Sequence, residues 1–149
     1  MDQLYYPNDS YTPWPGTVFA VWNQGPRKPP NPCRKYHVSA DLGSAAGVAA
    51  VTLPILRSLR LYHKVVQCES DLKAMQRGDQ AGKFITIYAP TNFTDATLVD
   101  GLGGALAKAG NLRPSPTVPR ARQYKHVFIE RPLDEGMFIY GGYETDPTA

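Results

Sequence analysis

The sequence predicts an α+β fold in which a single mixed or antiparallel sheet is covered by two main helices. Short segments with alternating polar and apolar residues are typical of half-buried strands, and they recur along the chain. Two longer segments, rich in small and aliphatic residues, have the length and composition of helices. The 149 residues are 42% hydrophobic and 19% charged, which is typical of a globular protein with one core.

The expected elements become regular from residue 34 onward, after one isolated strand. The expected strands are 17–22, 34–40, 61–68 and 82–90, and a terminal hairpin is formed by 125–131 and 136–143. The expected helices are 44–60, bent or restarted at Pro54, then 70–76, and finally 94–109, which ends at Gly110 and Asn111. Sheet and helix segments are therefore both present in one chain, as an α+β fold requires.

The first 33 residues differ in composition from the rest of the chain. They contain seven of the fourteen prolines, and the aromatic residues Tyr5, Tyr6, Tyr11 and Trp14. Proline fixes its own backbone angle and lacks an amide hydrogen, so this segment is predicted to be extended. We therefore divide the chain into an extended proline-rich and aromatic-rich arm, 1–33, and one domain, 34–149.

The distribution of charge favours an anionic ligand. The net charge is only +3, but residues 27–125 carry 15 Lys and Arg against 6 Asp and Glu. A solvated basic surface explains this distribution as well as a bound phosphate does. The sequence has no basic helix, RNA-binding aromatic strand or helix-turn-helix pattern, so nucleic acid is not the expected partner.

Patterns typical of membrane proteins and of metal sites are missing from the sequence. The longest apolar stretch, 45–56, is too short to span a bilayer. Asp2 and Asp9 precede any apolar run, unlike the basic residues that begin a signal peptide. Cys33 and Cys68, like the three histidines, show no metal-ligand spacing. We expect a cytoplasmic protein that needs neither a membrane nor a metal ion.

Alternation along the strands places polar residues on shared faces. Lys35 and His37 share a face of strand 34–40, and this pair could bind a phosphate and transfer a proton. Lys64 lies among apolar residues in strand 61–68, where it is either a guard against edge-to-edge aggregation or a desolvated functional amine. Tyr88 shares a face with Thr86 and is either a core residue or part of a site.

Four arginines are candidates for binding an anion, because guanidinium groups bind phosphate through paired hydrogen bonds. Each of them, taken alone, is better explained as a solvated surface residue. They are Arg77, which precedes strand 82–90, and Arg113, Arg120 and Arg122 in the loop after the last helix.

Taken in order, these residues resemble the phosphothreonine lyase family. The resemblance rests on Lys35-Tyr36-His37-Val38-Ser39, on Lys64 27 residues after the histidine, and on Arg77 followed by Phe84-Ile85-Thr86-Ile87-Tyr88. The family includes bacterial effectors of the OspF and SpvC type and the N-terminal lyase domain of class III lanthipeptide synthetases. The stretch GKFITIYAP and the ending Ile139-Tyr140-Gly141-Gly142-Tyr143 look most similar to the synthetase branch.

The resemblance implies a role for each matching residue. Lys64 would be the general base that removes the Cα proton, and His37 the general acid that protonates the leaving phosphate. Tyr88 would assist near the leaving group. Lys35 and Arg77 would bind the phosphate, and Arg120 and Arg122 are the best counterparts of the family's late arginines. The reaction would need no cofactor.

This chain departs from the synthetase branch at Ile139, where that branch usually has an arginine. We therefore expect one phosphate contact to be missing or to come from the preceding loop. The resemblance then implies a discrete lyase that forms dehydrobutyrine or dehydroalanine in a phosphorylated precursor peptide, beside a separate kinase and cyclase.

Three alternatives remain open at the level of sequence. The first is a non-catalytic module that binds a phosphopeptide or a leader peptide. The second is an effector lyase that acts on a host kinase. The third is a 2H-type phosphoesterase, whose paired H-x-S/T strands are matched by His37-Val38-Ser39 but not by His126-Val127-Phe128.

Overall fold

The computed structural model describes residues 3–30, 33–77, 81–93 and 96–115, and also the short segments 123–124, 127–129, 131–132 and 138–139. The four short segments contribute backbone positions only. Predictions about Arg120, Arg122 and His126 lie outside the described residues.

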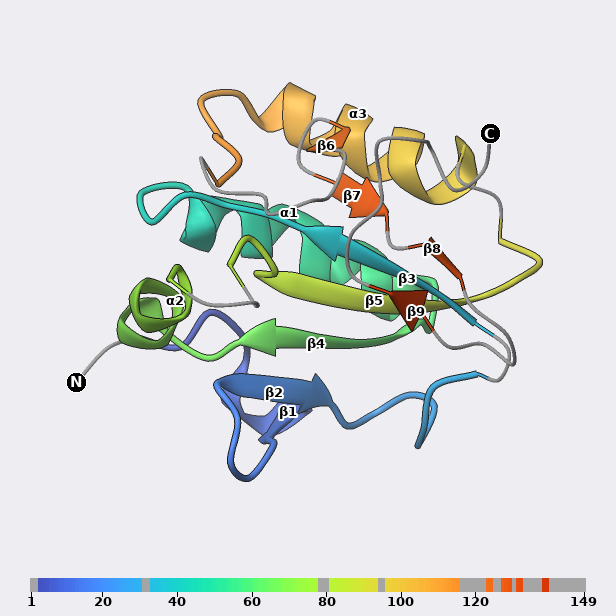
Figure 1. Ribbon diagram of the computed structural model, residues 1–149, viewed down its shortest axis with the longest axis horizontal. Helices are drawn as coiled ribbons and strands as arrows, with labels where there is room; N and C mark the ends of the chain where they lie inside the picture. The colour runs from blue at the N-terminus through green and yellow to red at the C-terminus, as the bar shows by residue number, and fades with distance from the viewer. Residues whose placement is uncertain are drawn as a thin grey trace.

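Seven strands form one antiparallel sheet, and two more form a small separate pair (Figure 1). The order across the large sheet is β1-β2-β4-β5-β3-β7-β6, so β5 lies between β4 and β3. Neighbouring strands in this order are antiparallel in every described pair. The strands are β1 (Tyr11–Pro13), β2 (Phe19–Trp22), β3 (Cys33–Val38), β4 (Tyr62–Val66), β5 (Ile85–Pro90), β6 (Gln123–Tyr124), β7 (Val127–Ile129), β8 (Arg131–Pro132) and β9 (Phe138–Ile139).

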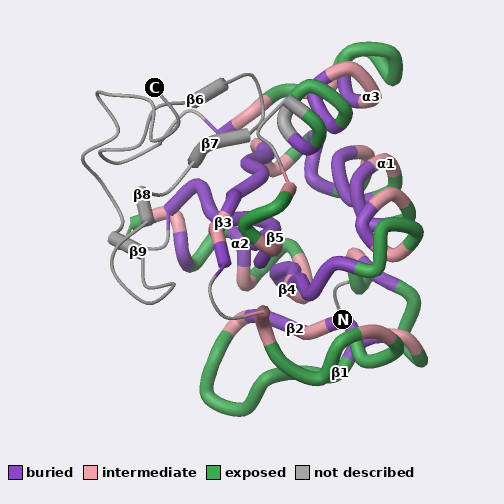
Figure 2. The backbone as a smooth tube through the Cα atoms, turned by 90° about the vertical axis from the view of Figure 1, so that its right-hand side faces the viewer, coloured by how far each residue is buried: buried purple, intermediate pink, exposed green. Residues whose placement is uncertain are grey.

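The two long helices lie together on one side of the sheet (Figure 2). They are α1 (Ala45–Ser58) and α3 (Gly101–Ala109), which pack against each other. A short helix, α2 (Glu69–Met75), connects the end of β4 to the start of β5. A single 3-10 turn, η1 (Asn8–Ser10), precedes β1, and a π-helical turn, η2 (Ala96–Asp100), leads into α3.

The hydrophobic core fills the space between the sheet and the two helices. Tyr36, Ile87 and Val65 come from one face of the central strands and are fully buried. Leu53 and Leu56 of α1 pack into the same cluster, as do Leu102 and Leu106 of α3. Truncating a leucine in such a site to alanine costs about 2–5 kcal/mol of stability. One face of the sheet is thereby used for packing against the two long helices.

The α+β class with one sheet and two main helices is confirmed. The sequence also predicted β2, β3, β4 and β5 to within a few residues. The helix predicted to bend or restart at Pro54 is instead one continuous helix. Pro54 is exposed, and the flanking Leu53 and Leu56 are buried in the core. Packing of these leucines therefore offsets the backbone hydrogen bond that proline cannot donate.

Strands β1 and β2 come from the segment that the sequence assigns to the arm. β2 pairs with β4, and β1 pairs with β2 at the edge of the described sheet. The hydroxyl of Tyr11 in β1 donates to Nε2 of the buried His63 in β4, at 2.6 Å. Arg57 of α1 in turn donates to the Tyr11 oxygen at 3.2 Å. This chain of bonds fastens β1 to the sheet and to a helix, while the boundary at residue 33 stays an interpretation.

No helix built from the described residues is long and apolar enough to cross a membrane.

Candidate functional site

His37 and Lys64 lie in one row across the face of the sheet that the two long helices leave uncovered. His37 of β3 is paired with Thr86 of β5, and Lys64 of β4 is paired with the same Thr86 from the other side. Directly opposed residues of antiparallel strands project from the same face. Adjacent strands are about 4.8 Å apart, so the Cα atoms of His37 and Lys64 are separated by roughly 10 Å.

A second row lies beside the first, two residues further along each strand. Lys35 of β3 is paired with Tyr88 of β5, and Tyr88 is paired with Tyr62 of β4. The Lys35 Nζ lies 5.5 Å from the centroid of the Tyr88 ring. The structure thus brings together four residues that the sequence singled out: Lys35, His37, Lys64 and Tyr88.

The environment of His37 fixes the orientation of its ring. The side chain is only 1% exposed, and its Nδ1 lies 3.1 Å from the Oγ1 of Thr86. A hydrogen bond to one ring nitrogen sets which nitrogen faces the reacting group. With Nδ1 directed to Thr86, the other ring nitrogen, Nε2, points away from Thr86 and is buried.

Two aromatic rings hold the amine of Lys64. Its Nζ lies 4.2 Å from the ring centroid of Phe19 and 5.1 Å from that of Trp14. Phe19 is buried in β2, whereas Trp14 is 42% exposed. Such rings attract the ammonium form and also remove water from around the amine. They therefore fix the position of Lys64 at one end of the row.

Trp14 stands on a rigid turn between β1 and β2. The amide of Thr17 donates to the Trp14 carbonyl at 3.1 Å, which closes a four-residue turn. Pro15 occupies the second position, and Gly16, with φ of +78°, occupies the third. This is the residue pattern of a type II turn, in which proline restricts the backbone and glycine accepts the positive φ. The indole beside Lys64 is consequently held by the turn itself.

The tyrosines of the second row form a small apolar cluster on the same face. Tyr62 and Tyr88 meet edge to face, with their ring centroids 5.3 Å apart. Cys33 and Val21 pack with them, apart from the main core. Burial raises the pKa of Tyr62 above its usual value, so it stays a neutral hydroxyl at physiological pH.

Several solved structures have the same fold as this chain. The VirA (SpvC) phosphothreonine lyase effector of Chromobacterium violaceum has a TM-score of 0.64 and 17% identity, over 90% of this chain and 68% of its own. The type III effector and phosphothreonine lyase OspF of Shigella flexneri has a TM-score of 0.57 and 13% identity, over 80% of this chain and 67% of its own. The chain has the phosphothreonine lyase fold.

The resemblance drawn from the sequence is thus confirmed at the level of the fold. A third match, the Salmonella plasmid virulence C protein (SpvC), has a TM-score of 0.55 and 13% identity, over 85% of this chain and 66% of its own. No protein-family model matches the sequence, and neither does any curated protein.

Within this lyase fold, the predicted phosphate-binding arginines are not joined to the two rows. Arg77 is an exposed residue just after α2, near the end of the sheet where β4 stops and β5 begins. No described contact links Arg77 to the rows. Arg120 and Arg122 lie outside the described residues, and Ile139 is described only as backbone in β9. The phosphate-binding roles of these arginines stay predictions.

Three residues of this face were not identified from the sequence as functional. Thr86 shares the alternation of Tyr88, so the pattern placed it on the correct face without indicating its hydrogen bond to His37. Phe19 and Trp14 belong to the first 33 residues, and their contact with Lys64 depends on the pairing of β2 with β4. A local pattern in the sequence contains no signal for that pairing.

Chemically, the face combines the amine of Lys64, the imidazole of His37 and the ammonium group of Lys35. An amine and an imidazole held at opposite ends of a short row could remove one proton and deliver another. The Lys35 ammonium could neutralise an anion bound between them. Among the residues that the structure describes, no three His, Cys, Asp or Glu side chains are close enough to hold a metal ion.

Proposed function

We propose that this protein is a lyase that eliminates phosphate from phosphothreonine or phosphoserine in a peptide, leaving a dehydroamino acid. The observation that carries the proposal is the alignment of His37 and Lys64 on either side of Thr86. β-Elimination needs a base at Cα and an acid at the oxygen on Cβ, and these two atoms are separated by only two bonds. A substrate threonine lying across the row would present its two reacting ends to two different strands.

Lys64 acts as a base in its neutral form, which the rings favour by excluding water and oppose by attracting the ammonium, and it takes the proton from Cα. The electrons of that C–H bond form the Cα=Cβ double bond, and the Cβ–O bond breaks with its electron pair leaving on the phosphate. Protonated His37 gives a proton from Nε2 to the departing bridging oxygen. The products are dehydrobutyrine or dehydroalanine and inorganic phosphate. Holding all the groups in place before reaction is what makes removal of so weakly acidic a proton feasible.

The phosphate would be bound at the end of the row nearest to Lys35. A phosphoryl group beside the imidazolium of His37 would also receive charge-assisted hydrogen bonds from the ammonium of Lys35. The hydroxyl of Tyr88 lies in the same second row and would contact the leaving oxygen. By the sequence resemblance, Arg77, Arg120 and Arg122 would also bind the phosphate. One of them would take the place of the arginine that the synthetase branch usually has at the position of Ile139.

We further propose that the substrate is a ribosomal precursor peptide and that a separate kinase and cyclase act with this protein in the cytoplasm. The support is the likeness of residues 82–90 to the lanthipeptide synthetase branch. Two of the similar solved structures, VirA (SpvC) and OspF, are effectors. An effector lyase and a lyase of peptide biosynthesis would carry out the same elimination on different substrates. A lyase of peptide biosynthesis should accept a short unfolded phosphopeptide as readily as a folded phosphorylated kinase.

Incubation of the protein with a phosphothreonine peptide tests the proposal directly. We expect the peptide to lose the mass of phosphoric acid and to gain the absorbance and thiol reactivity of a dehydroamino acid. Release of phosphate with an intact threonine would indicate a phosphoesterase instead. An unchanged peptide that binds tightly would indicate a binding module, and either result would refute the lyase proposal.

A further inference from the structure

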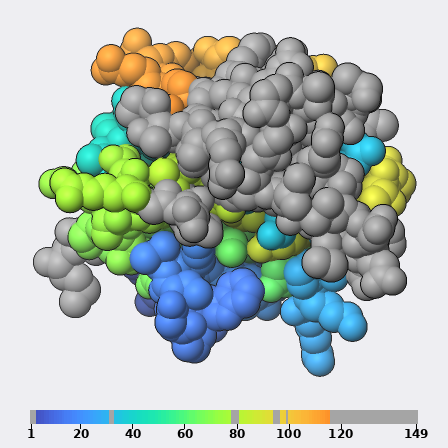
Figure 3. All heavy atoms as spheres, in the orientation of Figure 1, coloured from blue at the N-terminus to red at the C-terminus, as the bar shows by residue number. Residues whose placement is uncertain are grey.

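A pocket of about 250 Å³ opens beside the first row, on the side of β2. It is lined by residues of β1 and β2, of the segment that follows β2, and of β4: Thr12, Val21, Asn23, Gly25, Arg27 and Tyr62. In Figure 3, dark-blue atoms of the N-terminal strands and lighter blue atoms of the following segment stand on either side of a gap in which green atoms are visible. The volume is that of a site for one side chain and not for a whole cofactor.

This pocket continues the row that contains the proposed general base. Val21 is paired with Lys64, and Thr12 is paired with Val21, so all three project from one face. Tyr62 lies next to Lys64 on that face and contacts Tyr88. The pocket therefore begins on the strand next to that of Lys64, and the backbones of neighbouring strands are about 5 Å apart.

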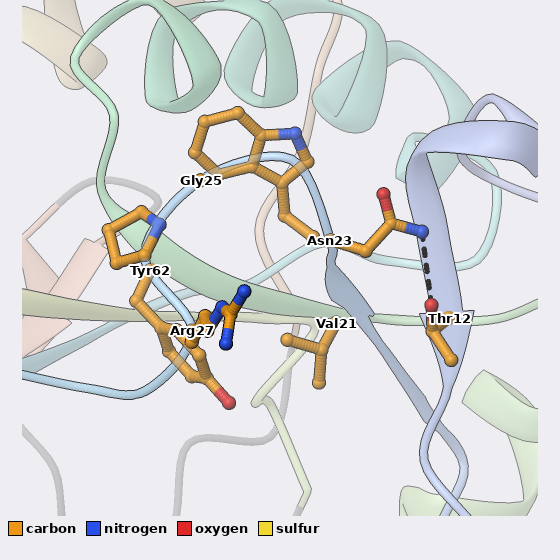
Figure 4. A pocket seen from close by; sticks show the side chains of 8 residues that line it. Thr12, Val21, Asn23, Gly25, Arg27 and Tyr62 are labelled. Atoms are coloured by element: carbon orange, nitrogen blue, oxygen red, sulfur yellow. Dashed lines mark hydrogen bonds between the residues drawn. The ribbon is translucent and has the colours of Figure 1, made fainter.

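The floor and one wall of the pocket are fixed by close contacts. A Cβ on Gly25 would lie 2.1 Å from the Trp22 ring, so the chain can pass over this indole only as glycine. The side-chain amide of Asn23 donates to the Thr12 hydroxyl at 3.0 Å, as the dashed line in Figure 4 shows. These two polar groups already bond to each other. The two contacts fix the positions of Gly25, Asn23 and Thr12 at the pocket.

Arg27 gives the pocket its charge. Its guanidinium points toward the space between Tyr62 and Val21 (Figure 4). In the described part of the chain, no carboxylate forms an ion pair with it. The surrounding walls are apolar, formed by Val21, the Tyr62 ring and Pro26. An apolar wall with one guanidinium fits a side chain that has an aliphatic stem and a carboxylate end.

We propose that this pocket binds a glutamate of the substrate peptide, close in sequence to the phosphorylated residue. The proposal rests on the lyase function proposed above and names the peptide feature that the same site selects. An extended peptide advances about 3.3–3.6 Å per residue. A Cα held beside Lys64 thus places a residue one or two positions away at the pocket. The carboxylate pairs with Arg27, and the methylene groups pack on Val21 and Tyr62.

The proposal is tested by varying the charge of one peptide residue and by reversing the charge at residue 27 of the protein. A set of phosphothreonine peptides carries a single Glu, Gln or Lys at each of about three positions on either side of the phosphothreonine. For the wild-type protein, kcat/KM should be about 3- to 10-fold higher with Glu than with Gln at one position, and lowest with Lys. Arg27→Glu should reverse this order at that position only. Lys108→Glu, the same change of charge on α3, should leave the order unchanged.

The outcomes separate this subsite from the lyase activity. If elimination occurs with equal kcat/KM for Glu, Gln and Lys at every position, the subsite is refuted and the lyase function stands. A preference for Glu that survives Arg27→Glu also refutes it. If no peptide is eliminated, the proposed function fails. In that case, fluorescence anisotropy measures the affinities of the Glu and Lys peptides for the wild-type protein and for Arg27→Glu. Tighter binding of Glu by the wild type, reversed in Arg27→Glu, would support the subsite independently of elimination, and equal affinities would refute it. Thermal unfolding of each variant confirms that it is folded.

Discussion

His37 and Lys64 lie opposite the same residue, Thr86, although their strands do not pair with each other. β5 separates β3 from β4, and its hydrogen bonds to both strands set the register on each side. The relative position of the two side chains is therefore fixed by the sheet backbone and not by a loop. Such rigidity is what an acid and a base need if they are to act on neighbouring atoms of one substrate.

Replacement of Lys64 should remove the proposed base while leaving the proposed phosphate site in place. We expect Lys64→Ala to abolish elimination and to change phosphopeptide affinity little. Lys64→Arg should also be inactive, because a guanidinium stays protonated at neutral pH. Mass spectrometry of the peptide after incubation gives the rate, and anisotropy gives the affinity. Near-normal turnover by either variant would exclude Lys64 as the base.

Loss of His37 should matter most when the leaving group needs a proton. We expect His37→Ala to slow elimination from phosphothreonine by roughly 10²- to 10⁴-fold. A peptide with fluoride at the same β-carbon should recover much of this loss, because fluoride departs with less help from an acid. Lys64→Ala should show no such recovery, since the Cα proton must still be removed. If His37→Ala binds the fluoro peptide but stays inactive on it, the acid has to be Tyr88 or Lys35.

Thr86 should act as a positioning residue for His37. Thr86→Val keeps the shape of the side chain but removes the oxygen 3.1 Å from Nδ1. The cost of losing one such bond is about 1–3 kcal/mol, so kcat should fall by about 5- to 150-fold while KM changes little. Thr86→Ser, which restores the hydroxyl, should restore kcat. A shift of the acidic or basic limb of the pH–rate profile in Thr86→Val, absent in Thr86→Ser, would separate this role from simple packing.

The sequence predicted which residues of β3, β4 and β5 share a face, because alternation is a local property of a strand. It could not predict that β5 lies between the other two strands. Pairing depends on contacts such as that of Lys64 with Thr86, which are far apart along the chain until the sheet forms. His37 and Lys64, the proposed acid and base, were therefore identified separately, and only the topology places them in one row.

Strand β1 was not predicted either, because it too depends on contacts between residues that are far apart along the chain. The segment Tyr11–Pro13 is short and contains a proline, which is a weak strand signal. Tyr11 is its only buried residue, and the Tyr11 hydroxyl bonds to His63, which is 52 residues away along the chain. The sequence identified Trp14 only as an aromatic residue of an arm. Its place beside Lys64 follows from the turn that β1 and β2 create.

The affinity for phosphate should depend on Lys35 and Arg77. Each alanine variant should weaken binding of the phosphorylated peptide by roughly 1.5–3 kcal/mol, which is about 10- to 150-fold. Binding of the unphosphorylated peptide should change little. Lys35→Arg should retain most of the affinity because the positive charge is kept. Equal weakening of both peptide forms by an alanine variant would mean that the residue contacts the peptide chain instead.

The stability of the fold should decrease in mild acid because of His63. This side chain is fully buried, its Nδ1 lies 2.8 Å from the Leu61 carbonyl, and its Nε2 accepts from Tyr11. Both nitrogens are thus satisfied by a neutral ring. Burial lowers the pKa of His63 from 6.5 to about 4, although the bond to Leu61 acts in the opposite direction. Between these two values the unfolded chain binds a proton that the folded chain does not.

The sign of the effect follows from that difference in bound protons. The contribution of His63 is fully present above pH 6.5 and is lost as the pH falls toward 4, reaching about 3 kcal/mol in total. Urea unfolding at several pH values measures the free energy. In His63→Gln, which cannot titrate, stability should be lower at neutral pH but should fall less on acidification. Because the carboxylates are common to both proteins, the difference between the two curves isolates His63. Parallel curves between pH 7 and pH 4 would show that the ring is protonated in the folded protein as easily as in the unfolded chain.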